Sequence, residues 1–165
     1  MKYRNLLAAT IMAASFGTYA FAGDAIVSTI NVNADFEAVD SSMAMKFWPT
    51  IESDLKKKLG ESLAARAGEN GVDIDVSIRE LTLNAAATDA SYSDLNGIDG
   101  VVAIRGPEED SPTKSFRVAY SVVPPTDSVP QEGIIVLQPD TADNYAALID
   151  AIVAEVRKQV DQIEM

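Results

Sequence analysis

Ser53 and Lys56 form the first pattern in the chain whose spacing could support chemistry. On a helix, the Ser-x-x-Lys spacing places a nucleophilic hydroxyl one turn from an amine. Enzymes that use this pair also carry Ser-Asp-Asn and Lys-Thr-Gly motifs, and here Ser93-Asp94 is followed by Leu95. We therefore interpret Ser53 and Lys56 as part of a solvated helix surface.

A second pattern, over residues 94–100, has oxygen ligands at a spacing close to that of a calcium-binding loop. However, Ile98 stands where an EF-hand loop needs its third oxygen ligand, and Arg105 stands where it needs a bidentate Glu. We therefore expect a polar loop that does not require calcium for folding. A weak, irregular Ca²⁺ site that also uses Asp89 stays open as an alternative.

Two residue types that often carry catalysis are missing, because the sequence contains no His and no Cys. The absence of His removes the commonest general base and the commonest metal ligand, and the absence of Cys removes thiolate nucleophiles and thiolate metal sites. Carboxylates, hydroxyls, Lys, Arg and Tyr remain, but 25 acidic residues offer too many arbitrary pairs to select one acid–base couple. The composition favours a protein that is not an enzyme and uses no cofactor and no metal.

Residues 1–22 have the layout of a secretory signal peptide. A short positively charged start is followed by an apolar run over residues 6–16 and by a small-x-small pattern at residues 20–22. A membrane-spanning helix needs about 20 apolar residues, more than this run supplies. We expect cleavage after residue 22, which leaves a single periplasmic or secreted domain over residues 23–165.

The chain is acidic, with a formal net charge of −12. Contact with nucleic acid or with an anionic membrane surface needs Lys and Arg. The acidity therefore disfavours nucleic acid and anionic membranes as partners. We expect no stable membrane insertion after cleavage. Solubility explains the acidity most simply, and a divalent cation or a basic partner is the alternative explanation.

Alternating apolar and polar residues predict half-buried strands over residues 26–36, 72–83 and 115–122. Two short apolar runs predict further strands over residues 101–104 and 134–137. Within the second of these, the alternation shifts phase after Ile78, which a bulge near Arg79-Glu80 would produce. Residues 84–99 have little periodicity and are predicted to form a long loop.

Two amphipathic helices are predicted, one from Pro49 to about Gly68 and one that Asp140 or Thr141 caps. The apolar positions of these helices and of the strands define a predicted core. Its members are Trp48, Leu55, Leu59, Ile74, Val76, Phe116, Val118, Leu148, Ile152 and Val156.

The element order β-α-β-β-β-β-α predicts an α+β two-layer sandwich. We expect a mainly antiparallel sheet of about five strands with both helices on one face. This order is similar to that of small accessory domains in bacterial envelope assembly machines. No motif in the chain is specific to one family.

Two helices cover only one face of such a sheet, so its polar face is the predicted partner-binding surface. The candidate residues are Asn31, Asn33, Asp35, Asp73, Asp75, Arg79 and Arg117. Simple solvation is the alternative, because antiparallel sheets often leave one face wet.

The sequence therefore favours a non-enzymatic secreted or periplasmic domain that binds a partner protein or an envelope component. Two alternatives remain open. One is a protein that binds a small ligand or, weakly, Ca²⁺. The other is a hydrolase that uses carboxylates or Ser.

Overall fold

The computed structural model describes residues 25–34, 46, 48–83, 95–122, 133–137 and 143–163. The predicted signal peptide and the predicted start of the mature chain lie outside these residues. In chain order the elements are β1 (Val27–Ala34), α2 (Ile51–Ser62), the short 3-10 helix η1 (Ala64–Arg66), β2 (Val72–Leu83), β3 (Leu95–Arg105), β4 (Thr113–Ser121), β5 (Ile135–Val136) and α3 (Asn144–Asp161).

The described strands form one sheet in the order β1-β2-β3-β4-β5. Its long central pairings, β2 with β3 and β3 with β4, are antiparallel. The two outer pairings, β1 with β2 and β4 with β5, are parallel. The predicted α+β class and mainly antiparallel sheet are confirmed.

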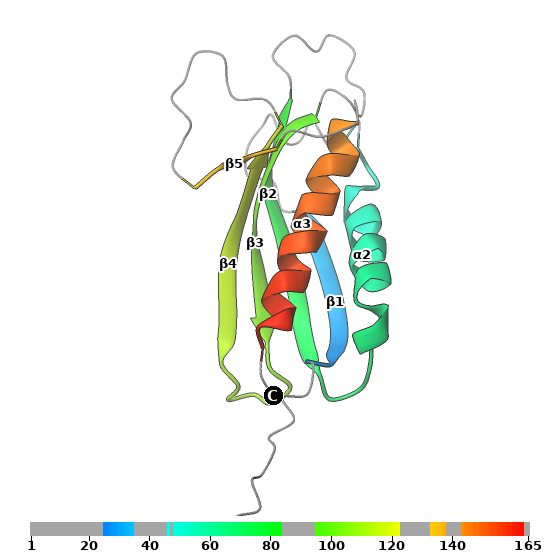
Figure 1. Cartoon of the computed structure of the whole chain (residues 1–165), viewed down its shortest axis with the longest axis vertical. Coiled ribbons are helices and arrows are strands. Elements are labelled where there is room, and N and C mark those ends of the chain that lie inside the picture. Colours follow the sequence, from blue (N-terminus) through cyan, green and yellow to red (C-terminus); the bar gives the residue numbers. More distant parts are fainter. Residues whose placement is uncertain are drawn as a thin grey trace, which may run out of the picture.

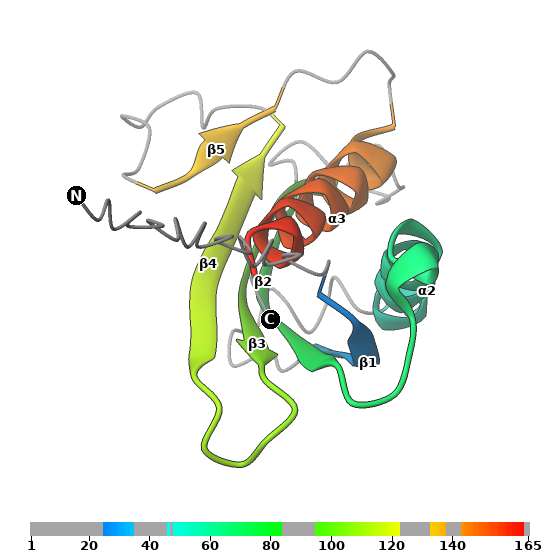
Figure 2. The same cartoon turned by 60° about the horizontal axis from the view of Figure 1, so that its bottom comes forward.

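Both described helices cover the same face of this sheet (Figures 1 and 2). Helix α2 forms the crossover between the parallel strands β1 and β2, and packs on β1 and on α3. Helix α3 packs on β3 and β4. Within the described parts of the chain, no helix has the length and apolar character needed to cross a membrane.

The core lies between this helix layer and the sheet. All but one of the ten predicted core residues are buried. They include Trp48, which precedes α2 in the sequence, and Ile152 on α3. Phe116 is the exception and is only partly buried, although it packs against the core. It lies on β4, and β5, the described strand on the side of β4 away from β3, pairs only with Tyr120 and Ser121.

The predicted bulge in β2 is confirmed. Ile78 is opposite Gly100 and Glu80 is opposite Asp99, so Arg79 is the extra residue of the pairing. The bulge moves the buried positions from the even residues before it to Leu81 after it.

The start of β1 differs from the prediction. A register irregularity lies between Val27 and Thr29, so Val27 is 5% exposed whereas Ile26 is 40% exposed. The hydroxyl of Ser28 accepts a hydrogen bond from the Gly71 N–H (2.6 Å), which ties the irregular segment to β2. The alternation of apolar and polar residues that begins at Ile26 is therefore interrupted at Ser28.

The helix boundaries also differ from the prediction. Helix α2 ends at Ser62, not near Gly68, because the chain after η1 turns to run beside β1 and the Gly68 N–H bonds the Val27 carbonyl. Helix α3 is capped by Asp143, whose carboxylate accepts from the Ala146 N–H. Asp140 and Thr141 lie outside the described residues.

The predicted loop over residues 84–99 is wrong in its last part. Residues 95–99 belong to β3, the central strand of the sheet, which has paired neighbours on both sides. Residues 84–94 lie outside the described part of the chain.

Candidate functional site

The face of the sheet opposite the helices is polar, and we call it the open face. Ile74, Val76 and Ile78 point toward the helices and are buried, so the residues between them point to the other side. The strand register extends this assignment across the sheet. The described open-face residues include Thr29, Asn31, Asn33, Asp73, Asp75, Ser77, Glu80, Asp99, Val101, Ala103, Arg105, Ser115, Arg117 and Ala119.

Asp75 is the centre of one polar cluster on the open face. The Asn31 amide donates to its Oδ1 (3.1 Å), and the Arg105 guanidinium donates to its Oδ2 (2.5 Å). These contacts cross from β1 over β2 to β3. Both carboxylate oxygens are engaged, so the position of the Asp75 side chain is well defined, although 24% of it remains exposed.

Asp99 and Arg117 form a second ion pair, between β3 and β4. The Arg117 guanidinium donates to the Asp99 carboxylate from both Nε and Nη2. The hydrogen bond to Asp99, followed by the charge of Asp99, raises the pKa of Arg117 above its ordinary value, and Glu80 adds a smaller effect of the same sign. Arg117 remains half exposed and keeps its charge.

Small and apolar residues lie between the two ion pairs. Val101 pairs with Ser77 on one side and with Arg117 on the other. Ala103 pairs with Asp75 and Ser115. An apolar centre with charged groups around it is the usual anatomy of a recognition surface.

The structure brings most of the predicted candidate residues onto this face. Asn31, Asp75 and Arg117 belong to the two clusters, and Asn33 and Asp73 share the face through the register. Arg79 is exposed but is the bulged residue of β2, outside the regular alternation. Asp35 lies outside the described residues.

Three charged residues of the open face were missed by the sequence analysis: Glu80, Asp99 and Arg105. The last two lie on β3, where odd-numbered residues from Asp99 to Arg105 share one face. The predicted strand began too late to include Asp99. Glu80 takes the open-face position that Arg79 would hold without the bulge.

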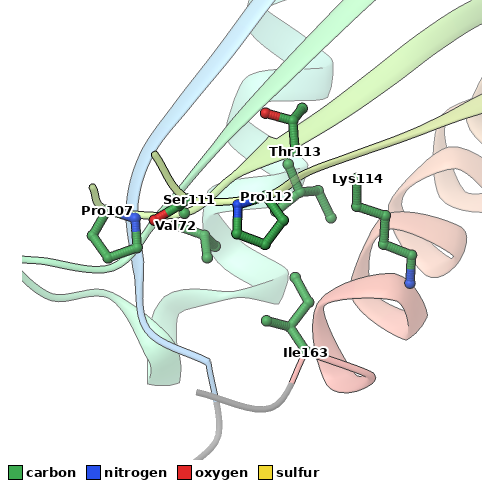
Figure 3. Close-up of a pocket in the computed structure, with 9 residues that line it drawn as sticks. Val72, Pro107, Ser111, Pro112, Thr113, Lys114 and Ile163 are labelled. Carbon is green, nitrogen blue, oxygen red and sulfur yellow. The ribbon is translucent and has the colours of Figure 1, made fainter. Parts of the chain in front are cut away.

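A separate cavity of about 340 Å³ lies at the end of the sheet near the β3–β4 hairpin (Figure 3). Its walls are mainly apolar, with Lys114 as the one cationic side chain among them. The lining residues are Val72, Ile104, Gly106, Pro107, Ser111, Pro112, Thr113, Lys114 and Ile163. The Lys114 amine donates to the Gln162 side chain (3.4 Å). Such a cavity has the size and composition of a small-ligand site.

The Ser-x-x-Lys pattern does not form a catalytic pair in the described structure. The Ser53 hydroxyl donates to the Thr50 carbonyl (2.8 Å) and Lys56 is exposed on α2. The same spacing recurs at Ser111 and Lys114 in the cavity wall. There the Ser111 hydroxyl accepts from the Glu108 N–H, and the Lys114 amine points toward α3 (Figure 3).

The segment considered as a calcium loop is mainly strand. Asp99 is bound by Arg117, and residues 95–100 are in β3. Asp89 and Asp94 lie outside the described residues. Among the residues that are described, no group of three acidic side chains is placed to hold a metal ion.

No family model and no curated protein matches the chain. Solved structures with a low similarity to this chain include the PelC dodecamer from Paraburkholderia phytofirmans, 9% identical with a TM-score of 0.43, over 85% of this chain and 88% of that chain. The hypothetical protein CT253 from Chlamydia trachomatis is 10% identical with a TM-score of 0.41, over 84% and 98%. A minor lipoprotein from Acinetobacter baumannii is 11% identical with a TM-score of 0.26, over 79% and 91%. At these values none of the likenesses assigns a family or a function to this chain.

Proposed function

We propose that this protein is an exported, non-enzymatic binding domain whose open face docks a partner protein or another component of the cell envelope. The observation that carries the proposal is the one-sided architecture. Both described helices lie on one face of the sheet, and the other face presents two ordered ion pairs around an apolar centre. The signal-peptide pattern of residues 1–22 supports export.

The open-face ion pairs are difficult to explain by stability alone. Partly exposed pairs of this kind contribute only about 0–1 kcal/mol to folding. Strand positions do, however, hold charged groups more rigidly than loops do, and rigid placement favours recognition. Charged groups of both signs, held in fixed positions, give specificity and faster association with a complementary partner.

Charge-swap variants test this proposal. The first exchanges the open-face charges through Asp75→Arg with Arg105→Asp and Asp99→Arg with Arg117→Asp. The matched control exchanges an exposed pair on α2 through Lys57→Glu with Glu61→Lys. Both variants keep the net charge, and each pair can reform with opposite polarity.

Each protein would be produced with a C-terminal tag in its native host, cross-linked and purified with its partners. We expect the wild type and the α2 control to retain the same partner, and the open-face swap to lose it. Equal recovery of that partner by the open-face swap would contradict the proposal. Circular dichroism establishes that each variant is folded.

The cavity supports a second candidate function, the binding of a small ligand that is mainly apolar. Its volume and its apolar walls are the supporting observations. A thermal-shift screen with metabolites and fatty acids tests this function. A ligand that binds there should lose its stabilising effect when Ile104→Trp fills the cavity, whereas stabilisation that persists in Ile104→Trp would place the ligand elsewhere.

A further inference from the structure

The outer edge of β4 has a row of backbone groups that no described strand pairs with. The Val122 N–H donates to the Asn96 carbonyl (2.9 Å), and the Ser121 carbonyl accepts from the Leu137 N–H (2.6 Å). The backbone N–H and carbonyl groups of even-numbered residues therefore point toward β3, and those of odd-numbered residues point away from it. The two directions alternate along an antiparallel strand. Thr113, Ser115 and Arg117 consequently turn their N–H and carbonyl groups outward, and we call them the β4 edge.

Strand β5 leaves this edge open within the described chain. It pairs only with Tyr120 and Ser121. Gly133, which precedes β5, comes close to the Arg117 side chain but not to the earlier residues of β4. The residues from Thr113 to Ser115 are exposed. Figure 1 shows the long lower part of β4 extending beyond β5.

The charges of β4 determine which strand fits there. Although the chain has 25 acidic residues and 13 basic ones, the strand from Thr113 to Ser121 carries two cations, Lys114 and Arg117, and no acid. Pairing with a second copy of β4 would bring like charges together, which is unfavourable. Lys and Arg on an edge strand thus oppose self-association while they attract an acidic strand.

We propose that the β4 edge accepts an extended acidic segment of a partner protein as an added antiparallel strand. Lys114 and Arg117 are three residues apart and point to opposite faces of the sheet. The partner strand therefore needs an acid opposite each of them, an apolar residue opposite Phe116 and a polar residue opposite Ser115. Its sequence pattern is acid–apolar–polar–acid. Backbone pairing at the edge carries this inference, so it does not rest on the open-face proposal, although Arg117, which binds Asp99, belongs to both surfaces.

The probe is a fluorescein-labelled peptide Val-Glu-Val-Thr-Glu-Thr, and the control peptide has Lys in place of both Glu. Fluorescence anisotropy with the full chain measures both dissociation constants. We expect the acidic peptide to bind at least about tenfold more tightly than the basic one, because close charge pairs discriminate by that amount or more. Equal or weaker binding of the acidic peptide would overturn the proposal.

Amide hydrogen exchange locates the binding. The peptide should slow exchange of the Ser115 and Arg117 amides, which point along the edge. Protection at other residues only would overturn the proposal. Protection of these two amides already present in the free protein would overturn it too, since a segment of the same chain would then occupy the edge.

Protein variants complete the test. Ser115→Pro removes an outward N–H without removing a β3–β4 hydrogen bond, and it should abolish binding. Lys114→Glu should weaken binding of the acidic peptide about tenfold, whereas Lys56→Glu, the same charge change on α2, should leave it unchanged. If Ser115→Pro is unfolded, the comparison of Lys114→Glu with Lys56→Glu decides the matter, and equal binding by these two variants rejects the proposal.

Discussion

Gly71, immediately before β2, lies close to the backbone of Ile26, immediately before β1. A Cβ at this position would lie 2.3 Å from the Ile26 carbonyl oxygen, which is far inside contact distance. We expect Gly71→Ala to destabilise the protein by about 1–3 kcal/mol, as overpacking does. Gly60 is the matched control, because a Cβ there meets nothing within 4 Å.

Gly60 lies inside α2, so Gly60→Ala should stabilise by about 0.5–1 kcal/mol through helix propensity. Urea denaturation of both variants measures the two effects. Shifts of the same sign would show that the approach of β1 to β2 has been placed wrongly.

The buried phenol of Tyr120 should make the unfolding free energy depend on pH in the alkaline range. It is 6% exposed on β4, and burial, followed by the charge of Glu155, raises its pKa from 10.0 to about 12. Glu155 is ionised throughout this pH range, and a hydrogen bond from Gln159 lowers the pKa of its carboxyl group. The folded chain therefore keeps the phenol proton in a range where the unfolded chain loses it.

The contribution of Tyr120 is fully present below about pH 10 and is lost as the pH rises toward 12. The total loss is at most about 3 kcal/mol. Unfolding free energies of the wild type should fall across this range, and Tyr120→Phe should flatten that fall. The same slope in both proteins would contradict the assignment.

At the scale of elements, the two helices depend on apolar stripes that face the sheet. Leu55 on α2 and Ile152 on α3 are both fully buried. Leu55→Ala and Ile152→Ala should each lower the unfolding free energy by about 2–5 kcal/mol. Lys56→Ala, one residue along α2 and exposed, should change it by less than about 0.5 kcal/mol. Denaturant melts in which all three variants match the wild type would refute the helix phasing.

The sequence predicted an element well where periodicity alone determined it. In β2, the apolar residues are even-numbered up to Ile78 and odd-numbered from Leu81, and a bulge is the local structure that makes such a shift. The pairing of Ile78 and Glu80 with adjacent residues of β3 confirms it. Both helices were predicted for the same reason, with errors confined to their ends.

The first half of β3 could not be predicted in this way. Asn96, Gly97 and Gly100 are typical of turns, yet all three lie in a strand with neighbours on both sides. A Cβ at Gly100 would lie 2.5 Å from the Ser77 carbonyl oxygen, so this glycine permits close approach of two strands. Composition alone does not distinguish that role from a turn.

At the scale of the whole molecule, the polarity of the two sides of each strand predicted which face of the sheet the helices cover. It did not predict which strands are neighbours in the sheet. Because β2 and β4 each have an apolar and a polar side, the sequence was sufficient to predict helices on one face and an open face on the other. The ion pairs Asp75–Arg105 and Asp99–Arg117 depend on strand order and register. Those are properties of long-range pairing, which local patterns do not contain.

Site-specific photo-crosslinking in the native host tests the open-face proposal most directly. A benzoylphenylalanine at Ser77 would lie in the middle of the open face, between Asn33 and Val101. The control places the same group at Lys57, whose side chain is 75% exposed on α2. We predict that irradiation links the protein to a second macromolecule from Ser77 and not from Lys57. Crosslinks from Lys57 with none from Ser77 would contradict the account, because the working surface would then lie on the helix side.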